Sequence, residues 1–255
     1  MIEKLMKLQI IKRIIPSLYK RYIFFKKDYS KELTIDNIKY DFDLRHLIDR
    51  RFFFHKKYED ELFLPIRNLI KKNNIDYFLD IGSCWGIYSL RLCKSFKNLN
   101  ILAFDPIKNN INRLKKSILK NKINNIKLFH TAIGSKKGNI ILGSTDKHSP
   151  NYKVNQIKSA IIENSKVDTL DNLFFKKNKN LVIKIDTEGY ELEVLKGANN
   201  LLKNNKCYCQ IEIIDSNKKN IFEFMREINY KLISINNINK SDYIFSNFIT
   251  EKIYV

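Results

Sequence analysis

The sequence of 255 residues contains few cysteines and no long apolar run. Its four cysteines, Cys84, Cys93, Cys207 and Cys209, are too few to staple a chain of this length and lack the paired spacing of a zinc site. No apolar run is longer than a few residues, so neither a secretory signal nor a membrane span is visible. We therefore expect a cytoplasmic protein in a reducing compartment, folded around its own core.

Acidic residues are also scarce. The sequence has 27 Asp and Glu but 47 Lys and Arg, which gives a formal net charge of +20. Such a charge suits anionic partners, but Lys is accompanied by Ile and Asn throughout and forms no concentrated block, as a compositional bias would produce. Residues 2–15 alternate apolar and basic residues with helical spacing up to Pro16. This segment predicts either a helix packed on the domain or a peripheral membrane contact through the basic N-terminus.

The pattern of apolar residues changes near residue 73. Residues 1–72 are typical of a helical N-terminal extension that ends in an amphipathic helix over 62–72. From Tyr77 onward, short apolar runs alternate with amphipathic stretches, which is the signature of a parallel, doubly wound sheet. The predicted strands are 77–81, 100–104, 126–130, 181–185 and 208–213, and the predicted helices are 87–95, 107–120, 191–202 and 220–228.

Two segments depart from this rhythm. Residues 133–142 predict a hairpin and begin an insertion, which continues to residue 175 and which we expect to lie over the ends of the strands. Predicted strands over 231–235 and 243–249 are close enough in sequence to pair antiparallel. The sequence thus predicts an α/β fold of Rossmann-like type, in which residues 73–255 form a doubly wound, mostly parallel seven-stranded sheet with an antiparallel last strand.

The stretch from Phe78 to Gly86 is the most informative part of the chain. A buried strand ends at Asp80 and passes through Gly82, Ser83 and Gly86 into a helix, and glycine allows a tight turn and a close approach to a ligand. The stretch lacks the Gly-x-Gly-x-x-Gly spacing that makes room for a dinucleotide pyrophosphate, which Asp80 would also repel. A carboxylate there suits the positively charged amino-acid end of S-adenosylmethionine.

Asp105 closes the next predicted strand and is followed by Pro106. An acid at that point accepts hydrogen bonds from ribose hydroxyls in dinucleotide folds, and each charge-assisted bond contributes about 1.5 to 3 kcal/mol. The alternative role of Asp105 is to cap a helix whose first residue is Pro106. Ala132, just past the third strand, falls where an adenine ring would stack. These residues complete the predicted cofactor-binding set.

A second motif, IKIDTEGYELEVLKGA over residues 183–198, delivers Asp186 and Glu188 to the same edge of the sheet. Methyl transfer to an oxygen requires an acceptor held near the methyl donor and removal of the hydroxyl proton, and either carboxylate suits these tasks. Alternatively, both are first-turn acids of a helix that begins near Gly189. His148 in the polar insertion is a third candidate base, although a loop histidine is more often simply exposed.

In order along the chain, the motifs FLDIGxxxG, AFDP, AIGSKKG, VDTLD, IKIDTEGYELEVLKGA and QIEI resemble the FkbM family of methyltransferases. The resemblance covers about residues 78–212. It implies a class I methyltransferase fold, S-adenosylmethionine as methyl donor, and O-methylation of a hydroxyl on a sugar, glycan or secondary metabolite. It places Asp80, Gly82 and Gly86 in the cofactor loop, Asp105 at the ribose, and Asp186, Glu188 and Gly189 in the acidic motif.

Two departures from the family pattern preserve the small or acidic character of the site. Ser83-Cys84 stands where the family often has Ala-Asn, and Asp105 stands where it often has Glu. Two other functions stay open: methylation of an RNA ribose 2'-hydroxyl, and a non-catalytic binding module. The chain has no Asp-Pro-Pro-Tyr-like motif and no proline before a cysteine, which argues against nucleobase chemistry. Converging carboxylates also suit Mg²⁺, but no spacing signature indicates it, so we predict no metal site.

Overall fold

The computed structural model describes residues 9–144, 152–154, 161–235 and 241–249. The chain divides into two compact units, Met1–Tyr58 and Glu59–Val255. The helix α4 (Asp60–Lys72) therefore belongs to the larger unit, although the sequence pattern groups it with the N-terminal extension. Within the described ranges, no helix combines the length and the apolar character needed to cross a bilayer.

The smaller unit contains a β-hairpin between two helices, in the order α2 (Gln9–Lys26), β1 (Ser30–Ile35), β2 (Ile38–Asp43) and α3 (Leu47–His55). The strands pair antiparallel across Asp36 and Asn37, whose left-handed φ angles of 51° and 62° suit a two-residue hairpin turn. Tyr40, Phe42 and Phe52 are buried and pack ring to ring. The expectation of a helical extension therefore omitted this hairpin, which the Asp36-Asn37 pair marks in the sequence.

Helix α2 is also longer than the sequence pattern predicts. It continues through Pro16, where the expected helix ends, and reaches Lys26. A proline inside a helix removes one backbone hydrogen bond. Beyond the proline the helix remains packed in its unit, where Ile23 is buried with 2% of its surface exposed.

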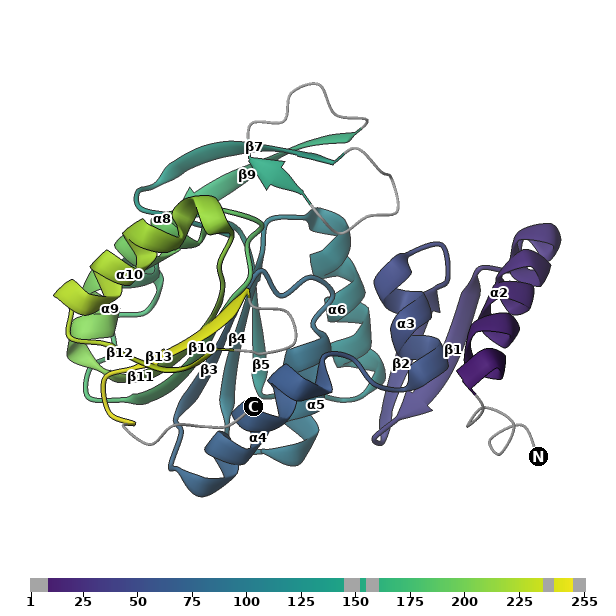
Figure 1. Ribbon diagram of the computed structural model, residues 1–255, viewed down its shortest axis with the longest axis horizontal. Coiled ribbons are helices and arrows are strands. Elements are labelled where there is room, and N and C mark those ends of the chain that lie inside the picture. The colour runs from purple at the N-terminus through teal and green to yellow at the C-terminus, as the bar shows by residue number, and fades with distance from the viewer. Residues whose placement is uncertain (1–8, 145–151, 155–160, 236–240, 250–255) are drawn as a thin grey trace. The chain divides into compact units, whose positions relative to one another are not determined.

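A seven-stranded sheet forms the centre of the larger unit (Figure 1). Its order is β12 (Lys231–Ile235), β13 (Asp242–Ser246), β11 (Lys206–Glu212), β10 (Asn180–Ile185), β3 (Tyr77–Ile81), β4 (Asn100–Asp105) and β5 (Ile126–His130). Neighbouring strands from β11 to β5 pair parallel, while β13 pairs antiparallel with both of its neighbours. The predicted doubly wound, mostly parallel sheet with an antiparallel last strand is confirmed.

Helices cover both faces of this sheet (Figure 1). One face packs in a large apolar core with α7 (Leu170–Leu173), α8 (Glu191–Lys196), α9 (Asn199–Asn204) and α10 (Lys218–Glu227). The other face is covered by α5 (Ile87–Ser95) and α6 (Lys108–Lys120), with α4 packed beside α5. Cys207 and Cys209 are free thiols buried in the first core, as their spacing within one strand predicts.

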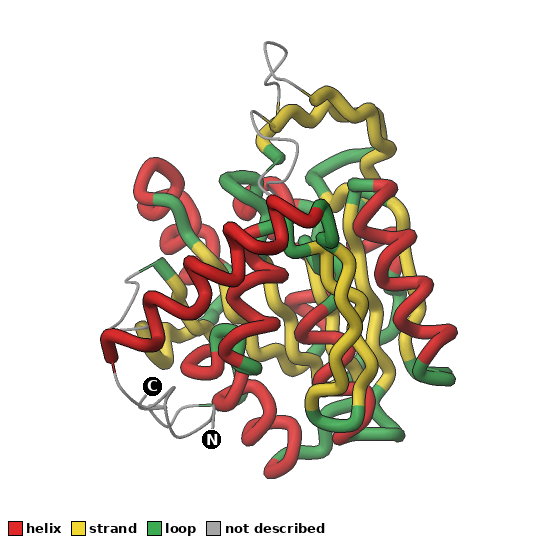
Figure 2. Tube along the Cα trace, turned by 90° about the vertical axis from the view of Figure 1, so that its right-hand side faces the viewer, coloured by secondary structure: helices red, strands yellow, loops and turns green. Residues whose placement is uncertain are grey.

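The insertion forms a second, four-stranded sheet, which we call the insertion sheet. Its order is β6 (Ala132–Ile133), β9 (Ile161–Asp168), β7 (Gly138–Ser144) and β8 (Lys153–Val154). The hairpin expected over 133–142 is wrong, because β6 pairs with β9 in parallel and β7 pairs with β8 and β9. Strands distant in sequence thus replace the local pairing. The insertion sheet lies beyond the carboxyl ends of the central strands, at the top of Figures 1 and 2.

The helix expected over 191–202 is divided into α8 and α9 at Gly197. At Gly197 the chain passes very close to the start of the insertion. A Cβ atom there would lie 1.9 Å from the carbonyl oxygen of Gly134, although the backbone angles of Gly197 suit any residue. Close contact between two backbones therefore requires glycine at this break.

We expect Gly197→Ala to lower the free energy of unfolding by about 3 kcal/mol, because the added methyl group overpacks a backbone contact. Urea denaturation monitored by circular dichroism measures this change. Gly138→Ala is the matched control, since a Cβ atom at Gly138 meets nothing within 4 Å, and its effect should stay within about 0.5 kcal/mol. Equal stability of the two variants would show that the contact is not tight.

Candidate active site

Four acidic side chains gather at the carboxyl edge of the central sheet. Asp80 lies in β3, Asp105 ends β4, Asp186 follows β10 and Glu212 ends β11. Because these strands are parallel neighbours, their carboxyl ends lie together. Asp80 is close enough to both Asp105 and Asp186 for their charges to interact. The structure therefore brings the three sequence-predicted aspartates to one site.

A buried lysine lies at the centre of this group. Lys184 is aligned with Asp80 in β3 and with Gln210 in β11, so the three side chains share one face of the sheet. The Lys184 ammonium lies 2.7 Å from a carboxylate oxygen of Asp186 and 4.9 Å from the centre of the Tyr88 ring. Sequence reasoning missed Lys184. The available signal was a single cation within a strand of buried apolar residues.

Two carboxylates share the positive charge of Lys184. Burial alone would lower the pKa of Lys184, but Asp186 and Asp80 hold it above its usual value. Burial raises the pKa of Asp80. Lys184 opposes this shift, and so does a hydrogen bond of 2.6 Å that the Ser89 hydroxyl donates to Asp80. Burial would also raise the pKa of Asp186, but Lys184 and a hydrogen bond with Glu212 bring it below its usual value. Asp186 is therefore an ionised carboxylate.

The neighbouring acids on β11 and β13 hold their protons more strongly. Burial raises the pKa of Glu212 to about 9, and the hydrogen bond with Asp186 adds to the shift. Asp242 is aligned with Glu212 across the two strands, and burial raises its pKa to about 6. The Gln210 amide group lies 3.5 Å from an Asp242 oxygen. At neutral pH, Glu212 is a protonated carboxyl group beside the ionised Asp186.

Asp105 anchors the loop after β3. Its Oδ2 accepts a hydrogen bond of 2.8 Å from the backbone N–H of Cys84, and its Oδ1 accepts bonds from the N–H of Ile107 and the side chain of Asn110. Oδ1 thus has two donors, while Oδ2 retains one acceptor position. Burial raises the pKa of Asp105 to about 7. Helix α6 begins beyond Ile107, so Asp105 is not its cap and Pro106 is not its first residue.

The two glycines of this loop are required by contacts with the protein itself. Gly82 and Gly86 have left-handed φ angles of 76° and 83°. A Cβ atom at Gly82 would lie 1.8 Å from the carbonyl oxygen of Asp186, and one at Gly86 would lie 2.5 Å from the Leu114 side chain. Between them, Ser83 is buried and its Oγ has no hydrogen-bond partner among the described residues. The loop is therefore fixed by β10 and α6 before any ligand is considered.

A buried glutamate holds the acidic loop after β10. Glu191 Oε1 accepts hydrogen bonds from the backbone N–H and hydroxyl of Thr187 and from the N–H of Gly189. Between these residues, Glu188 has a left-handed φ of 54°. Because α8 begins only at Glu191, neither Asp186 nor Glu188 is one of its first-turn acids. That alternative is excluded, and the structure gives Glu191 the role of fixing the loop.

The insertion sheet reaches both sides of this edge. Burial raises the pKa of the Tyr152 hydroxyl, and Glu163 and Asp105 add to the shift, so Tyr152 lies on the Asp105 side. Burial raises the pKa of Glu188, whereas Lys153 opposes it, so Lys153 lies on the Glu188 side. Tyr152, just before β8, and Lys153, the first residue of β8, thus approach the cofactor-loop acid and the acidic loop respectively.

Two of the remaining sequence-predicted residues, Ala132 and Pro106, lie on the Asp105 side. Ala132, in β6 of the insertion sheet, is buried in an apolar cluster that also contains Ile107. Pro106 is partly exposed, and its carbonyl oxygen lies 3.0 Å from a ring nitrogen of His130. His148 lies outside the described residues.

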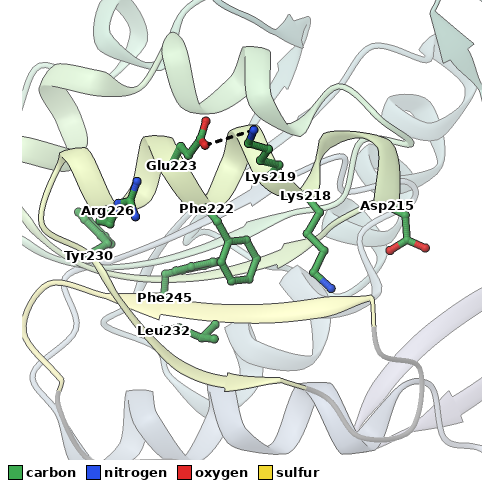
Figure 3. Close-up of a pocket in the computed structure, with 9 residues that line it drawn as sticks. All are labelled: Asp215, Lys218, Lys219, Phe222, Glu223, Arg226, Tyr230, Leu232 and Phe245. Carbon is green, nitrogen blue, oxygen red and sulfur yellow. Dashed lines mark ion pairs between the residues drawn. The ribbon is translucent and has the colours of Figure 1, made fainter.

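The described residues contain no metal-binding cluster, and two surface pockets are lined by residues other than those of this site. In the part of the chain that is described, no group of three or more His, Cys, Asp or Glu side chains is arranged to hold a metal ion. Figure 3 shows a surface pocket of about 680 Å³ along α10, where Phe222 and Phe245 lie between Lys218 and Arg226. A second pocket, of about 500 Å³, includes His130. Neither pocket is lined by a sequence-predicted site residue.

The strand order, in which β13 runs antiparallel beside a row that is parallel from β11 to β5, is that of a class I methyltransferase fold. The family model described as "Methyltransferase FkbM domain" matches residues 80–232, which is more than half of the chain. The chain therefore belongs to the FkbM methyltransferase family. No curated protein matches it.

Several solved structures are similar to the chain at low sequence identity. Precorrin-6y C5,15-methyltransferase from Geobacter metallireducens GS-15 is 12% identical over 76% of this chain and 90% of its own, with a TM-score of 0.46. An rRNA methylase from Streptococcus thermophilus is 11% identical over 68% and 86%, with a TM-score of 0.42. The tRNA (uracil-54, C5)-methyltransferase of Pyrococcus abyssi, in complex with S-adenosyl-L-homocysteine, is 9% identical over 86% and 43%, with a TM-score of 0.46.

We expect Glu212 to make the stability of the fold depend on pH. Its pKa is raised in the folded state, so its contribution to the free energy of unfolding is fully present below its ordinary value of 4.5 and is lost as the pH rises toward about 9. Glu212→Gln keeps a neutral hydrogen-bond donor and should remove this loss. Urea denaturation between about pH 5 and pH 9 measures it. Glu227→Gln on the exposed end of α10 should behave as the unmodified protein, and parallel curves for all three proteins would contradict the assignment.

Proposed function

We propose that this chain is an S-adenosylmethionine-dependent O-methyltransferase that acts on a hydroxyl of a sugar, glycan or secondary metabolite. The proposal rests on one observation, the placement of the ionised Asp186 beside the loop that Asp105 anchors, at the carboxyl edge of the sheet. Membership of the FkbM methyltransferase family supports methyl transfer as the reaction.

The loop after β3 has the polar groups that the donor requires. Asp105 Oδ2 retains one acceptor position, which a ribose hydroxyl would fill, and the unpartnered Ser83 hydroxyl lies next to Cys84 on the same loop. When bound, S-adenosylmethionine supplies a methyl group activated by a sulfonium charge. Asp80 was expected to contact the amino-acid end of the donor. Because Ser89 and Lys184 already accompany it and only 1% of Asp80 is exposed, we assign it instead to holding Lys184.

Asp186 is the group in this proposal that takes the acceptor proton. The side chain of Asp186 is 32% exposed, so an acceptor hydroxyl can reach it, whereas Asp80 is buried. Lys184 keeps Asp186 ionised, and an ionised carboxylate accepts the proton that must leave as the new oxygen–carbon bond forms. Glu212 already holds a proton and cannot serve as this base.

The local charge of the edge favours a neutral acceptor. On the acceptor side lie four carboxyl groups, those of Asp186, Glu188, Glu212 and Asp242, of which Glu212 is protonated. Among the described residues, the other three carboxylates have two cations beside them: Lys184, which is already paired with Asp186, and Lys153. Phosphate groups would be repelled here despite the net charge of +20 of the whole chain. We therefore favour a polyhydroxyl acceptor over an RNA ribose.

At about pH 8, above the raised pKa of Asp105 of about 7, Asp105→Asn should weaken binding of S-adenosylmethionine by about tenfold to a hundredfold, because a charge-assisted hydrogen bond to the ribose becomes a neutral one. Isothermal titration calorimetry measures the affinity. Asp171→Asn is the matched control, since Asp171 also accepts two backbone N–H bonds, from Asn200 and Leu201, but serves α9. An unchanged affinity in the Asp105 variant would remove this residue from the donor site.

Incubation with methyl-labelled S-adenosylmethionine should transfer label to neutral glycans or to small phenols, and not to RNA. Asp186→Asn should reduce the rate of transfer by about a hundredfold while the donor affinity is kept, because the variant loses the proton acceptor. Glu227→Gln is the control for both measurements. Label found in RNA alone would overturn the acceptor class, and full activity of the Asp186 variant would overturn its role.

A further inference from the structure

Helix α2 exposes an apolar stripe away from the side that packs in its unit. Leu18, Tyr22 and Phe25 are 58%, 55% and 81% exposed, whereas Ile23 is 2% exposed. At 3.6 residues per turn, the three exposed residues fall within an arc of about 60°, roughly 130° around the helix from Ile23. We call these three residues the α2 stripe. Helix α2 therefore has one apolar side buried in its unit and a second one in water.

Basic residues flank the α2 stripe. Arg21 and Lys26 are exposed and fall on opposite sides of it by the same helical geometry. The helix contains no acidic residue in its sequence, QIIKRIIPSLYKRYIFFK. Exposed apolar side chains bordered by cations match the interface of an anionic bilayer, where the acyl boundary takes the apolar groups and the headgroups pair with the cations.

We propose that the α2 stripe docks this protein peripherally on a bilayer surface that contains anionic lipid. Charge decides against the other occupants. A second copy of the chain would bring together two helices whose charged residues are all basic, and their like charges oppose this contact. A nucleic acid would pair with Arg21 and Lys26 but would leave Leu18 in water. The proposal does not depend on the methyl-transfer function.

Flotation of the full-length chain with lipid vesicles tests the docking. We expect binding to phosphatidylcholine vesicles that contain phosphatidylglycerol, little binding to phosphatidylcholine alone, and weaker binding at high salt. Phe25→Ser should weaken binding by about tenfold because an aromatic side chain no longer leaves water. The double variant Arg21→Glu, Lys26→Glu should weaken it by more than about tenfold.

Matched controls separate the α2 stripe from general stickiness. Phe175 is 82% exposed in the larger unit, so Phe175→Ser removes the same side chain from water without touching α2. The double variant Lys115→Glu, Lys116→Glu makes the same change of net charge on the exposed side of α6. Both controls should change vesicle binding by less than about twofold. Tyr22→Ser replaces Phe25→Ser if circular dichroism shows that the latter does not fold.

Three results would overturn the proposal. Binding that is equal on neutral and anionic vesicles, or absent from both, excludes docking on anionic lipid. Equal losses in the α2 variants and the control variants exclude the α2 stripe as the contact. Light scattering that shows a dimer in the unmodified chain and a monomer in Phe25→Ser assigns the stripe to a second copy instead.

Discussion

The ion pair of Lys184 with Asp186, together with the electrostatic attraction between Lys184 and Asp80, is the interaction on which the candidate site depends. It joins β10 to β3, and removal of the cation would leave Asp80 buried without its compensating charge. Asp186 also ties the backbone of the two strands together, because its N–H donates to the carbonyl of Ile81 and its own carbonyl packs against Gly82. The same residues that fix the sheet edge therefore fix the cofactor loop.

This constraint divides the acids of the site by task. Asp80 is buried and holds Lys184, Asp105 fixes the loop and keeps one acceptor position, and Asp186 stays ionised and reachable. Glu191 fixes the acidic loop by accepting hydrogen bonds from Thr187 and Gly189. The acidic edge also contrasts with the basic helix α2, so the net charge of the chain describes neither region. Local charge, not composition, is what a ligand meets at each place.

Much of the larger unit could be predicted from sequence because its elements follow strong local periods. Strands and helices from Tyr77 to Ser95 occur where the alternation of apolar residues predicts them. The failures come from contacts between distant residues: the insertion strands pair across long separations, and Gly197 divides a helix because Gly134 lies against it. The hairpin of the smaller unit was missed although Asp36 and Asn37 mark its turn.

At the site, sequence could name the acids but not their partners. The aspartates stand in recognisable motifs, whereas Lys184 and Glu191 acquire their roles only when strand register and loop shape are known. Sequence alone explains Gly82 and Gly86 by a close approach to the ligand. Packing against Asp186 and Leu114 already requires glycine at both positions.

A crystal structure of the chain with S-adenosyl-L-homocysteine tests the central claim most directly. We expect the ribose hydroxyls to contact Asp105, the adenine to lie near Ala132, and the sulfur to face Asp186 at the carboxyl edge of β10. Product bound elsewhere, for example in the α10 pocket of Figure 3, would contradict the account.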